Sequence, residues 1–341
     1  MRLIPVLVAL LAVLGGITVF RKVSLHAGEA PVPKEIVTLY AQWKNNFRKL
    51  YATPAEDIHR LKTFYSQKLF VDKANAEYAE ALWERDGELL EAPMFTLNDF
   101  SDLSQDEFLV KYTGAQVPEE PVPQYDGPLD HLDAPQNLQQ SGYQIRVRNQ
   151  GSCGSCWAFS AIACFEKQYF DATKQRVDLS QQNLVDCDGG SNGCNGGYIH
   201  SGLNYIRGNS VSLASNYPYA GARGACRNAA KVNKLNFGVV NYGFSTSAAV
   251  NAINSGKHTG VTVFATGRFR NVGNSGNFDA SLTGECGNTI NHAVNAVGQS
   301  GGFLNILNSW GGNWGNGGLK MIKPCGGNNL WGNAGTVSWA Q

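Results

Sequence analysis

Hydrophobic residues recur every three or four positions between residues 34 and 86, which predicts two amphipathic helices. The helices are separated at residues 53–56. There Thr53 can cap the second helix, Pro54 fits its first turn and Glu56 completes a capping box. The apolar positions that carry the pattern are Ile36, Leu39, Tyr40, Trp43, Phe47, Ile58, Leu61, Phe64, Tyr65 and Leu69.

Further along the chain the pattern changes from helical to strand-like. An extended piece at 94–97 precedes a short acidic helix that Ser104 caps, with Glu107 three residues on. The remaining elements are predicted helices near 155–170, 180–186 and 198–207, then β runs at 237–242, 260–264, 293–297, 303–307 and 319–322. Helices followed by strands predict an α+β fold in two halves.

Two segments divide the chain. Residues 3–20 form an apolar run between Arg2 and the pair Arg21 and Lys22, which suits a secretory signal peptide or signal anchor over residues 1–27. Residues 116–135 hold five prolines, at 118, 121, 123, 128 and 135. Such a stretch is extended and exposed, and we expect a protease to cut there.

The net charge differs in sign between residues 28–131 and residues 132–341. Residues 28–131 carry 10 Lys and Arg against 19 Asp and Glu (10 − 19 = −9), whereas residues 132–341 carry 15 against 8 (15 − 8 = +7). Parts of opposite sign attract each other. The net charge of the whole chain is +1, so we expect no nucleic-acid partner.

The cysteines lie only in the second part. Their clustering predicts disulfides and therefore an oxidising compartment. The eight positions are Cys153, Cys156, Cys164, Cys187, Cys194, Cys226, Cys286 and Cys325.

Residues 150–159 read Q-G-S-C-G-S-C-W-A-F and carry the strongest chemical signal. A thiol attacks a carbonyl as the thiolate, and a helix that begins beside Cys156 would favour the thiolate through its dipole. A nearby imidazolium would lower the thiol pKa further. Other interpretations stay open, namely a redox pair or half zinc site at Cys153 and Cys156, or two structural cysteines. No second C-x-x-C is present to complete a zinc site.

This segment resembles the nucleophile motif C-G-[SA]-C-[WY] of the papain family of cysteine peptidases. The resemblance implies a histidine roughly 130–150 residues later, with an asparagine beyond it. His292 lies 292 − 156 = 136 residues after Cys156 and opens an apolar strand. Asn308, in the run N-S-W-G, would accept a hydrogen bond from its imidazole, and Trp310 would shield that bond from water.

The first part resembles the inhibitory propeptide of cathepsin L-like precursors. Residues 98–102, N-D-F-S-D, follow the N-x-F-x-D pattern of such propeptides. An E-R-F-N-I-N spacing is followed, with departures at the fourth and fifth positions, by Glu56, Arg60, Phe64, Gln67, Val71 and Asn75. An ordinary amphipathic helix with pairs such as Glu56–Arg60 is the alternative interpretation.

The resemblance implies a papain-like, two-lobed α+β enzyme at residues 132–341, with a helical left lobe and a β-barrel-like right lobe. A mainly helical propeptide at 28–131 precedes it and acts as an intramolecular inhibitor by covering Cys156. Gln150 and the Cys156 N–H would stabilise the oxyanion. The implied substrate-binding residues are Gly196, Gly197, Tyr198, Ile290, Ala293 and Trp310, with the glycine pair binding an extended substrate like an added strand.

Three disulfides are implied in the same way. They are Cys153–Cys194, Cys187–Cys226 and Cys286–Cys325, which leave Cys164 as a buried free thiol. No metal or other cofactor is expected.

The function that follows from the resemblance is a cysteine endopeptidase made as a zymogen and acting on polypeptides through an acyl-enzyme. Acid would activate it by protonating carboxylates of the propeptide. No histidine-rich insertion stands between Cys194 and Cys226, which favours an endopeptidase over an exopeptidase. We expect a monomer of the secretory pathway, in a lysosome-like vacuole or outside the cell. The alternatives are a catalytically silent binding protein, which would be expected to lack Cys156, His292 or Gln150, and a transglutaminase-like acyltransferase.

Overall fold

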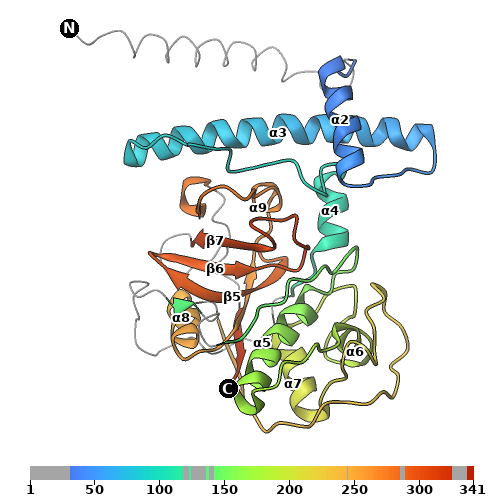
Figure 1. Ribbon diagram of the computed structural model, residues 1–341, viewed down its shortest axis with the longest axis vertical. Helices are drawn as coiled ribbons and strands as arrows, with labels where there is room; N and C mark the ends of the chain where they lie inside the picture. The colour runs from blue at the N-terminus through green and yellow to red at the C-terminus, as the bar shows by residue number, and fades with distance from the viewer. Residues whose placement is uncertain are drawn as a thin grey trace. The chain divides into compact units, whose positions relative to one another are not determined.

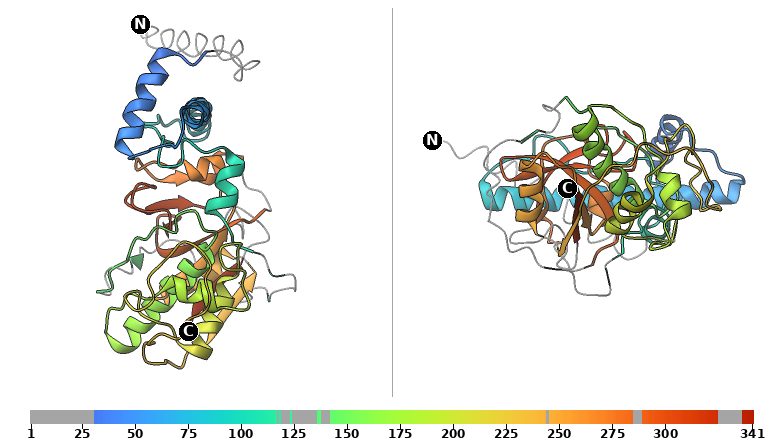
Figure 2. Two further views of the ribbon diagram at one scale, coloured as in Figure 1. Left: turned by 90° about the vertical axis from the view of Figure 1, so that its right-hand side faces the viewer. Right: turned by 90° about the horizontal axis from the view of Figure 1, so that it is seen from below.

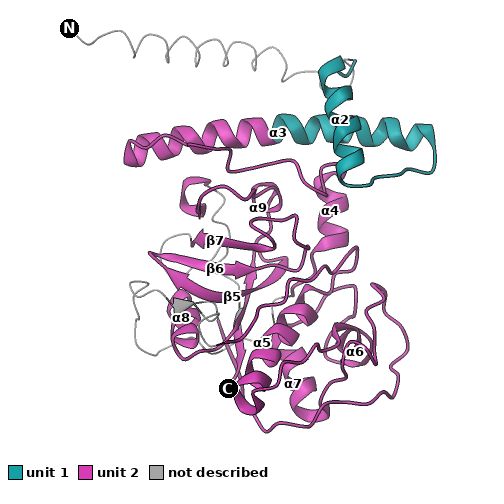
Figure 3. Cartoon of the chain, viewed as in Figure 1, with its two compact units in different colours: residues 1–70 teal, residues 71–341 magenta. Residues whose placement is uncertain are grey.

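Figure 1 shows the computed structural model of the chain. The structure describes residues 31–116, 118, 123, 136–137, 142–243, 245–284, 289–324 and 336–341. The expected signal segment 1–27 and most of the proline-rich stretch lie outside these residues. None of the helices described there is long and apolar enough to cross a lipid bilayer. The chain divides into two compact units, residues 1–70 and 71–341, and the division falls inside one long helix (Figure 3).

The described helices are α2 (Lys34–Asn46), α3 (Pro54–Asp86), α4 (Gln105–Tyr112), α5 (Cys156–Thr173), α6 (Gln181–Cys187), α7 (Ile199–Asn209), α8 (Thr246–Asn254), α9 (Gly267–Arg270) and the 3₁₀ turn η2 (Ala280–Leu282). The described strands are β1 (Gln136–Asn137), β2 (Val239–Gly243), β3 (Thr259–Val263), β4 (Phe278–Asp279), β5 (His292–Ser300), β6 (Phe303–Leu307), β7 (Leu319–Lys323) and β8 (Thr336–Ala340).

Unit 1 contains α2 and the first half of α3, joined by aromatic packing. The Phe64 ring centroid lies 5.3 Å from that of Tyr40 and 5.1 Å from that of Trp43. At the start of α3, Thr53 Oγ1 accepts a hydrogen bond from the Glu56 N–H at 3.1 Å, as the sequence predicts. The aromatic positions of the 3.6-residue pattern therefore hold the two helices together.

Unit 2 is built on one sheet with strand order β2-β8-β3-β5-β6-β7-β4, and β1 also pairs with β5. The pairings are antiparallel except that of β4 with β7. Helices α5, α6 and α7 gather in one half of this unit, and strands β5, β6 and β7 lie in the other (Figures 1 and 2). This arrangement is the two-lobed α+β fold that the resemblance implies.

Helix α5 packs against strand β5 and joins the two halves. Ser160 Oγ donates to the Val294 carbonyl at 3.1 Å, and Asn295 Nδ2 donates to the Ser160 carbonyl at 3.1 Å. Fourteen of the 18 residues of α5 are buried, so this helix is the centre of the hydrophobic core. The packing sets the N-terminus of α5 close to the first residues of β5.

Most predicted elements are confirmed to within a few residues. The capping box of α4 is present, since Ser104 Oγ accepts from the Glu107 N–H and the Glu107 carboxylate accepts from the Ser104 N–H. The extended piece at 94–97 forms a single bridge between Phe95 and Val272, not a strand of the sheet. Helix α8 and strand β8 were not predicted from the sequence.

Two of the three implied disulfides are present among the described residues. Cys153 bonds to Cys194, and Cys187 to Cys226, with Cα–Cα distances of 4.7 Å and 4.8 Å. Cys286 and Cys325 lie outside the described residues.

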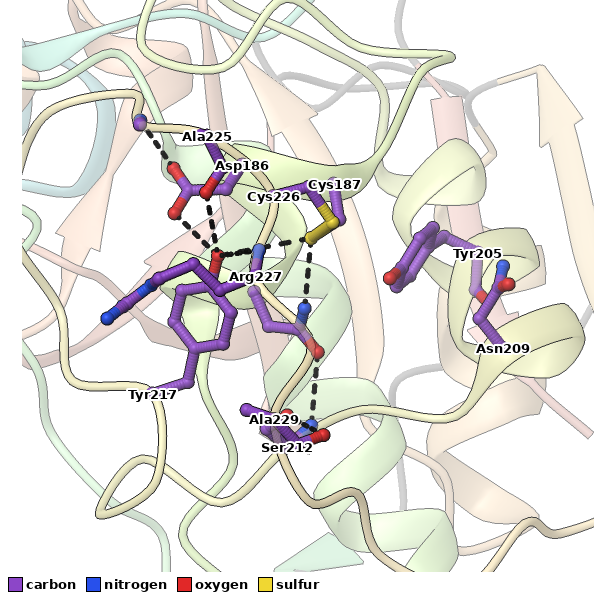
Figure 4. Close-up of a disulfide and its surroundings, with 12 residues drawn as sticks. Asp186, Cys187, Tyr205, Asn209, Ser212, Tyr217, Ala225, Cys226, Arg227 and Ala229 are labelled. Atoms are coloured by element: carbon purple, nitrogen blue, oxygen red, sulfur yellow. Dashed lines mark hydrogen bonds between the residues drawn. A yellow bond between two sulfur atoms is a disulfide. The ribbon is translucent and has the colours of Figure 1, made fainter.

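The surroundings of the Cys187–Cys226 bond form a hydrogen-bonded cluster, shown in Figure 4. The Tyr217 hydroxyl donates to Asp186 Oδ2 at 2.8 Å and accepts from the Arg227 N–H at 3.1 Å, close to the Cys187 sulfur. The Arg227 guanidinium lies over the Tyr217 ring, 4.1 Å from its centroid. This cluster ties the loop 217–227 to α6.

Candidate active site

Cys156 is the first residue of α5 and carries a free, fully buried thiol. The turn that precedes it depends on a glycine. A Cβ on Gly154 would lie 2.5 Å from the Cys194 carbonyl oxygen and 2.6 Å from that of Thr113. The Cys153–Cys194 disulfide fixes the same turn from one side. The thiol thus lies at the positive end of the α5 dipole, where a thiolate is favoured.

His292 begins β5 and is oriented by Asn308, which directly follows β6. His292 Nε2 and Asn308 Oδ1 are 2.8 Å apart, and the Ser309 N–H donates to the same oxygen at 2.8 Å. Because that oxygen accepts both bonds, Nε2 of a neutral imidazole carries the proton and Nδ1 is the basic nitrogen. The Trp310 ring stacks on the imidazole, with centroids 4.3 Å apart, and covers the bond.

Cys156 and His292 meet where the two halves of unit 2 join. The backbone of Ala293, the residue after His292, lies near enough to the Cys156 thiol to lower its pKa. Nδ1 of His292 has no hydrogen-bond partner in the part of the chain that the structure describes. The thiol therefore lies in the same cluster as the residue that follows His292, and no hydrogen bond joins it to Nδ1 in this form of the molecule.

Burial holds both groups in their neutral states. It raises the pKa of the Cys156 thiol to about 12, although backbone groups of Ala293 and Trp157 oppose the shift. Burial also lowers the pKa of His292 to about 4, against the opposing effect of its bond to Asn308. An uncharged thiol is a weak nucleophile, so this form of the site is latent.

Gln150 lies beside the nucleophile turn, and its side chain is held at both ends. Its Oε1 accepts a hydrogen bond from Ser309 Oγ at 2.6 Å. Its Nε2 donates to the Cys153 carbonyl at 2.9 Å and to the Tyr112 carbonyl at 3.1 Å. One amide hydrogen is therefore aimed at a carbonyl oxygen supplied by the segment that covers the site.

The covering segment is residues 112–116, at and beyond the end of α4. The Gly114 and Ala115 N–H groups both donate to the Asn291 carbonyl, at 2.7 and 2.9 Å. The Gln116 N–H donates to the Gly197 carbonyl at 3.0 Å, and the Gly197 N–H donates to the Gly114 carbonyl at 2.9 Å. These two bonds make a parallel bridge between Ala115 and Gly197. Ala115 also belongs to the same hydrophobic cluster as Cys156.

The predicted substrate-binding residues occupy different environments. Gly196 and Gly197 are buried, with Gly196 at φ +109°, and Gly197 pairs with the covering segment. Ala293 lies in the cluster that contains Ala115, and the half-buried Ile290 packs against that cluster. Tyr198 is half-buried, and its ring centroid lies 5.4 Å from that of His200.

Trp310 contacts both the imidazole and the cover. Besides stacking on His292, its indole N–H donates to the Tyr112 carbonyl at 3.1 Å. The Tyr112 oxygen therefore accepts from Trp310 and Gln150 together. Sequence reasoning assigned no role to Ser309, although it lies inside the N-S-W-G run, because a serine hydroxyl has no signature of its own.

Among the described residues, no group of three or more His, Cys, Asp or Glu side chains could hold a metal ion. The groups gathered at the site are a thiol, an imidazole and two carboxamides. This set suits nucleophilic acyl transfer with an acid–base partner.

Comparison with known proteins identifies the class. Residues 132–334 match the family model described as papain family cysteine protease, and residues 40–108 match the cathepsin propeptide inhibitor domain. The chain therefore belongs to the papain family of cysteine peptidases and is a zymogen that carries its own inhibitory propeptide.

Particular relatives support this assignment. Caricain of Carica papaya is 35% identical over 297 residues, which cover 83% of this chain and 80% of caricain. Cathepsin L 2 of Paramecium tetraurelia is 31% identical over 301 residues, which cover 83% of this chain and 87% of that protein. Among solved structures, digestive procathepsin L 3 of the Tenebrio molitor larval midgut is 27% identical with a TM-score of 0.72, covering 90% of this chain and 99% of that chain.

Proposed function

We propose that this peptidase is an endopeptidase with Cys156 as nucleophile and His292 as its acid–base partner. In this proposal Asn308 orients the imidazole and Gln150 stabilises the oxyanion. The observation that carries the proposal is the meeting of the α5 N-terminus, which bears Cys156, with the start of β5, where His292 is bonded to Asn308.

The chemistry follows from the positions of these groups. Once the site is uncovered, His292 Nδ1 takes the proton of the Cys156 thiol. The resulting thiolate attacks the carbonyl carbon of a peptide bond, and the carbonyl electron pair moves to the oxygen, where Gln150 Nε2 donates a hydrogen bond. The amide hydrogen now held by the Tyr112 carbonyl becomes available for this purpose once the cover leaves. As the C–N bond breaks, His292 gives its Nδ1 proton to the departing amine. His292 then takes a proton from the water that hydrolyses the acyl-enzyme, and the thiolate is released.

The decisive experiment compares acid-treated wild type with the variant Cys156→Ser. Wild type should hydrolyse a peptide substrate and lose activity to a thiol-directed epoxide, whereas the Cys156→Ser variant should do neither. Cys164→Ser is the matched control, because Cys164 is a second buried free cysteine of α5, and it should retain activity. A Cys156→Ser variant that still cleaves peptides at the wild-type rate would overturn the proposal.

The substrate is proposed to be an extended polypeptide with a bulky apolar side chain two residues before the cut. Gly197 exchanges two backbone hydrogen bonds with the covering segment, and this pairing supports the proposal that it binds extended substrate in the same way. Ile290 and Ala293 supply apolar surface nearby. A peptide library should show selection for large apolar residues at that position, and selection for charged residues there would contradict the assignment.

Activation is proposed to occur in acid. Helix α3 precedes the covering segment in the chain, and its residue Glu77 forms an ion pair with Arg268. Loss of this pair would weaken the attachment of α3 to α9. Burial also keeps His292 neutral with a pKa of about 4, whereas an exposed histidine titrates near 6.5. Between these values, falling pH favours the state in which His292 is uncovered and protonated, so acid weakens the cover.

The zymogen should therefore process itself faster at pH 4.5 than at pH 7. Glu77→Gln should shorten the half-time at pH 6 by about 1.5- to 5-fold, the range expected for an exposed ion pair. Glu80→Gln, on the same exposed side of α3, is the control. Gel electrophoresis with N-terminal sequencing measures both the rate and the processing site. Processing that does not accelerate below pH 7 would remove acid activation from the proposal.

The compartment is proposed to be the secretory pathway, leading to a lysosome-like vacuole or the cell exterior. Two disulfides in unit 2 support an oxidising route during folding. Cell fractionation should find the enzyme in such a compartment, and its recovery in the cytosol with reduced cysteines would contradict this.

A further inference from the structure

The hydroxyl of Tyr219 connects two residues of the nucleophile loop. It donates to the Gln150 carbonyl at 2.7 Å and lies 2.7 Å from Ser155 Oγ. A phenol has one hydrogen to donate, so Ser155 is the donor in the second bond. The resulting chain of two hydrogen bonds runs from Ser155 through Tyr219 to Gln150 and closes the loop 150–155 into a ring.

Two residues of this loop are glycines, whose backbone is conformationally free, so hydrogen bonds from outside the loop are needed to hold its shape. Gly151 adopts φ +58°, and Gly154 has no side chain with which to pack. The Cys153–Cys194 disulfide anchors the middle of the loop, and Tyr219 anchors its two ends. Gln150 and Ser155 are both fully buried, so an unpaired carbonyl or hydroxyl there would be costly.

Tyr219 is itself held in place from α5 and α6. Its ring packs edge-on against Phe159 of α5, with centroids 5.0 Å apart. The N–H of the next residue, Ala220, donates to Gln182 Oε1 at 2.8 Å. Asp186 Oδ1 accepts from the Gly224 N–H at 2.7 Å. The Tyr217 cluster and the Cys187–Cys226 bond fix the rest of the same loop (Figure 4).

We infer that Tyr219 is a positioning residue for catalysis, which sets the place of the Gln150 carboxamide by holding the backbone of Gln150 against the residue before Cys156. The inference rests on the proposed roles of Gln150 and Cys156. Loss of an oxyanion donor typically costs about 10²–10³ in rate. A donor that remains but is displaced loses part of this, so removal of the Tyr219 hydroxyl should cost about tenfold.

The test is a double-mutant cycle on the acid-activated enzyme. Tyr219→Phe keeps the ring and its packing and removes only the hydroxyl. We expect kcat to fall about tenfold with KM within about twofold, because the interaction acts on the transition state. In a Gln150→Ala background, Tyr219→Phe should cause no further loss. Wild-type kcat in Tyr219→Phe, or losses that multiply in the double variant, would overturn the inference.

A second readout separates positioning from general damage to the active site. Alkylation of Cys156 by iodoacetamide needs a thiolate but no oxyanion donor, so its pH profile should be the same in wild type and in Tyr219→Phe. Ser155→Ala tests the other end of the hydrogen-bond chain and should also lose kcat without an additive effect on Gln150→Ala. The control Tyr205→Phe changes a half-buried tyrosine of α7 and should leave kcat unchanged.

The outcomes distinguish the inference from the function on which it rests. An inactive wild-type enzyme, or an active Cys156→Ser variant, overturns the proposed function. An active wild type with an inert Cys156→Ser and an unimpaired Tyr219→Phe overturns only the role of Tyr219. An alkylation profile shifted by Tyr219→Phe would assign the effect to the thiol and overturn the role through Gln150.

Discussion

At the scale of single residues, the two groups that we propose to act in catalysis, Cys156 and His292, are uncharged in the covered form of the site. The proposed chemistry needs both groups charged, whereas burial raises the pKa of Cys156 and lowers that of His292. In the proposed mechanism, access of water to these two groups is what changes between zymogen and enzyme. The shifts have the direction that desolvation gives to an acid and to a base.

This leads to a prediction about thiol reactivity. At pH 7.5 the intact zymogen should react with iodoacetamide at least about 10²-fold more slowly at Cys156 than the processed enzyme does, because only a small fraction of the buried thiol is ionised. Mass spectrometry of the alkylated peptides measures both rates. Cys164 is the internal control, since burial raises its pKa to about 12 as well, and it should stay unreactive in both forms. Equal rates at Cys156 in the two forms would contradict a latent thiol.

The sequence predicted the four residues that we propose to act in catalysis but not the residues that hold them. Cys156, Gln150, His292 and Asn308 stand in short runs or at separations that carry chemical meaning. The Tyr219 hydroxyl acts across 69 residues of chain, and a tyrosine has the same appearance in a sequence whether or not its hydroxyl is bonded. Contacts of this kind depend on the fold and cannot be found from local patterns.

At the scale of elements, the most strongly apolar helices and strands were predicted well. The heavily buried α5 and the apolar run of β5 have strong patterns. Helix α8 has the sequence T-S-A-A-V-N-A-I-N, and a segment of nine residues shows too few turns for its pattern to be distinctive. Strand β8 is held by pairing with β2 and β3, so distant strands decide its conformation.

The covering segment gives a prediction at this scale. A Cβ on Gly114 would overlap the Gly154 carbonyl oxygen, which is part of the backbone and has little freedom to move. Gly114→Ala should therefore lift residues 112–116 from the site, and the zymogen should process itself at least about fivefold faster at pH 5. The half-time of processing on a gel measures the effect.

Gly189→Ala is the matched control, because a Cβ there would meet no atom within 4 Å. It should leave the half-time unchanged. A Gly114→Ala zymogen as slow as wild type would mean that the close approach to Gly154 does not contribute to the cover.

At the scale of the whole molecule, charge attraction between the acidic first part and the basic second part is only partly reflected in individual contacts. In the ion pair Glu77–Arg268 the acidic group belongs to the first part and the basic group to the second, as the net charges predict. In the hydrogen bond from Asn313 to Asp99, at 3.0 Å, the acidic group again belongs to the first part. The ion pair of Arg85 with Asp279 is reversed, because its positive charge belongs to the first part and its negative charge to the second. The net charges count all residues, whereas the contacts depend on a few.

Stability should fall in acid for a reason that also involves buried histidines. Burial, with a contribution from Lys167, lowers the pKa of His258 to about 3, and burial lowers that of His292 to about 4. The unfolded chain binds protons at these residues below about pH 6.5 while the folded chain does not. Stability is therefore lost as pH falls from 6.5 towards 4, by up to about 1.4 kcal/mol per pH unit for each histidine.

Urea unfolding of the Cys156→Ser zymogen, which cannot process itself, should show a lower midpoint at pH 4.5 than at pH 7. His258→Phe in the same background keeps an aromatic ring beside Tyr143, whose centroid lies 5.1 Å from that of His258. This variant should reduce the pH dependence. A urea midpoint that is independent of pH would show that protonation of these two histidines does not lower the stability of the folded chain.

The Cys153–Cys194 disulfide makes the geometry around Cys156 dependent on the redox state of the compartment in which the chain folds. It is the covalent link between the turn that presents the nucleophile and the loop that leads to Gly197. Thiol buffers of the cytosol reduce exposed or strained disulfides and prevent new ones from forming. We expect a molecule that folds in that environment to lack this bond and to lose the alignment of the turn, so that the redox state of the compartment limits where active enzyme is made.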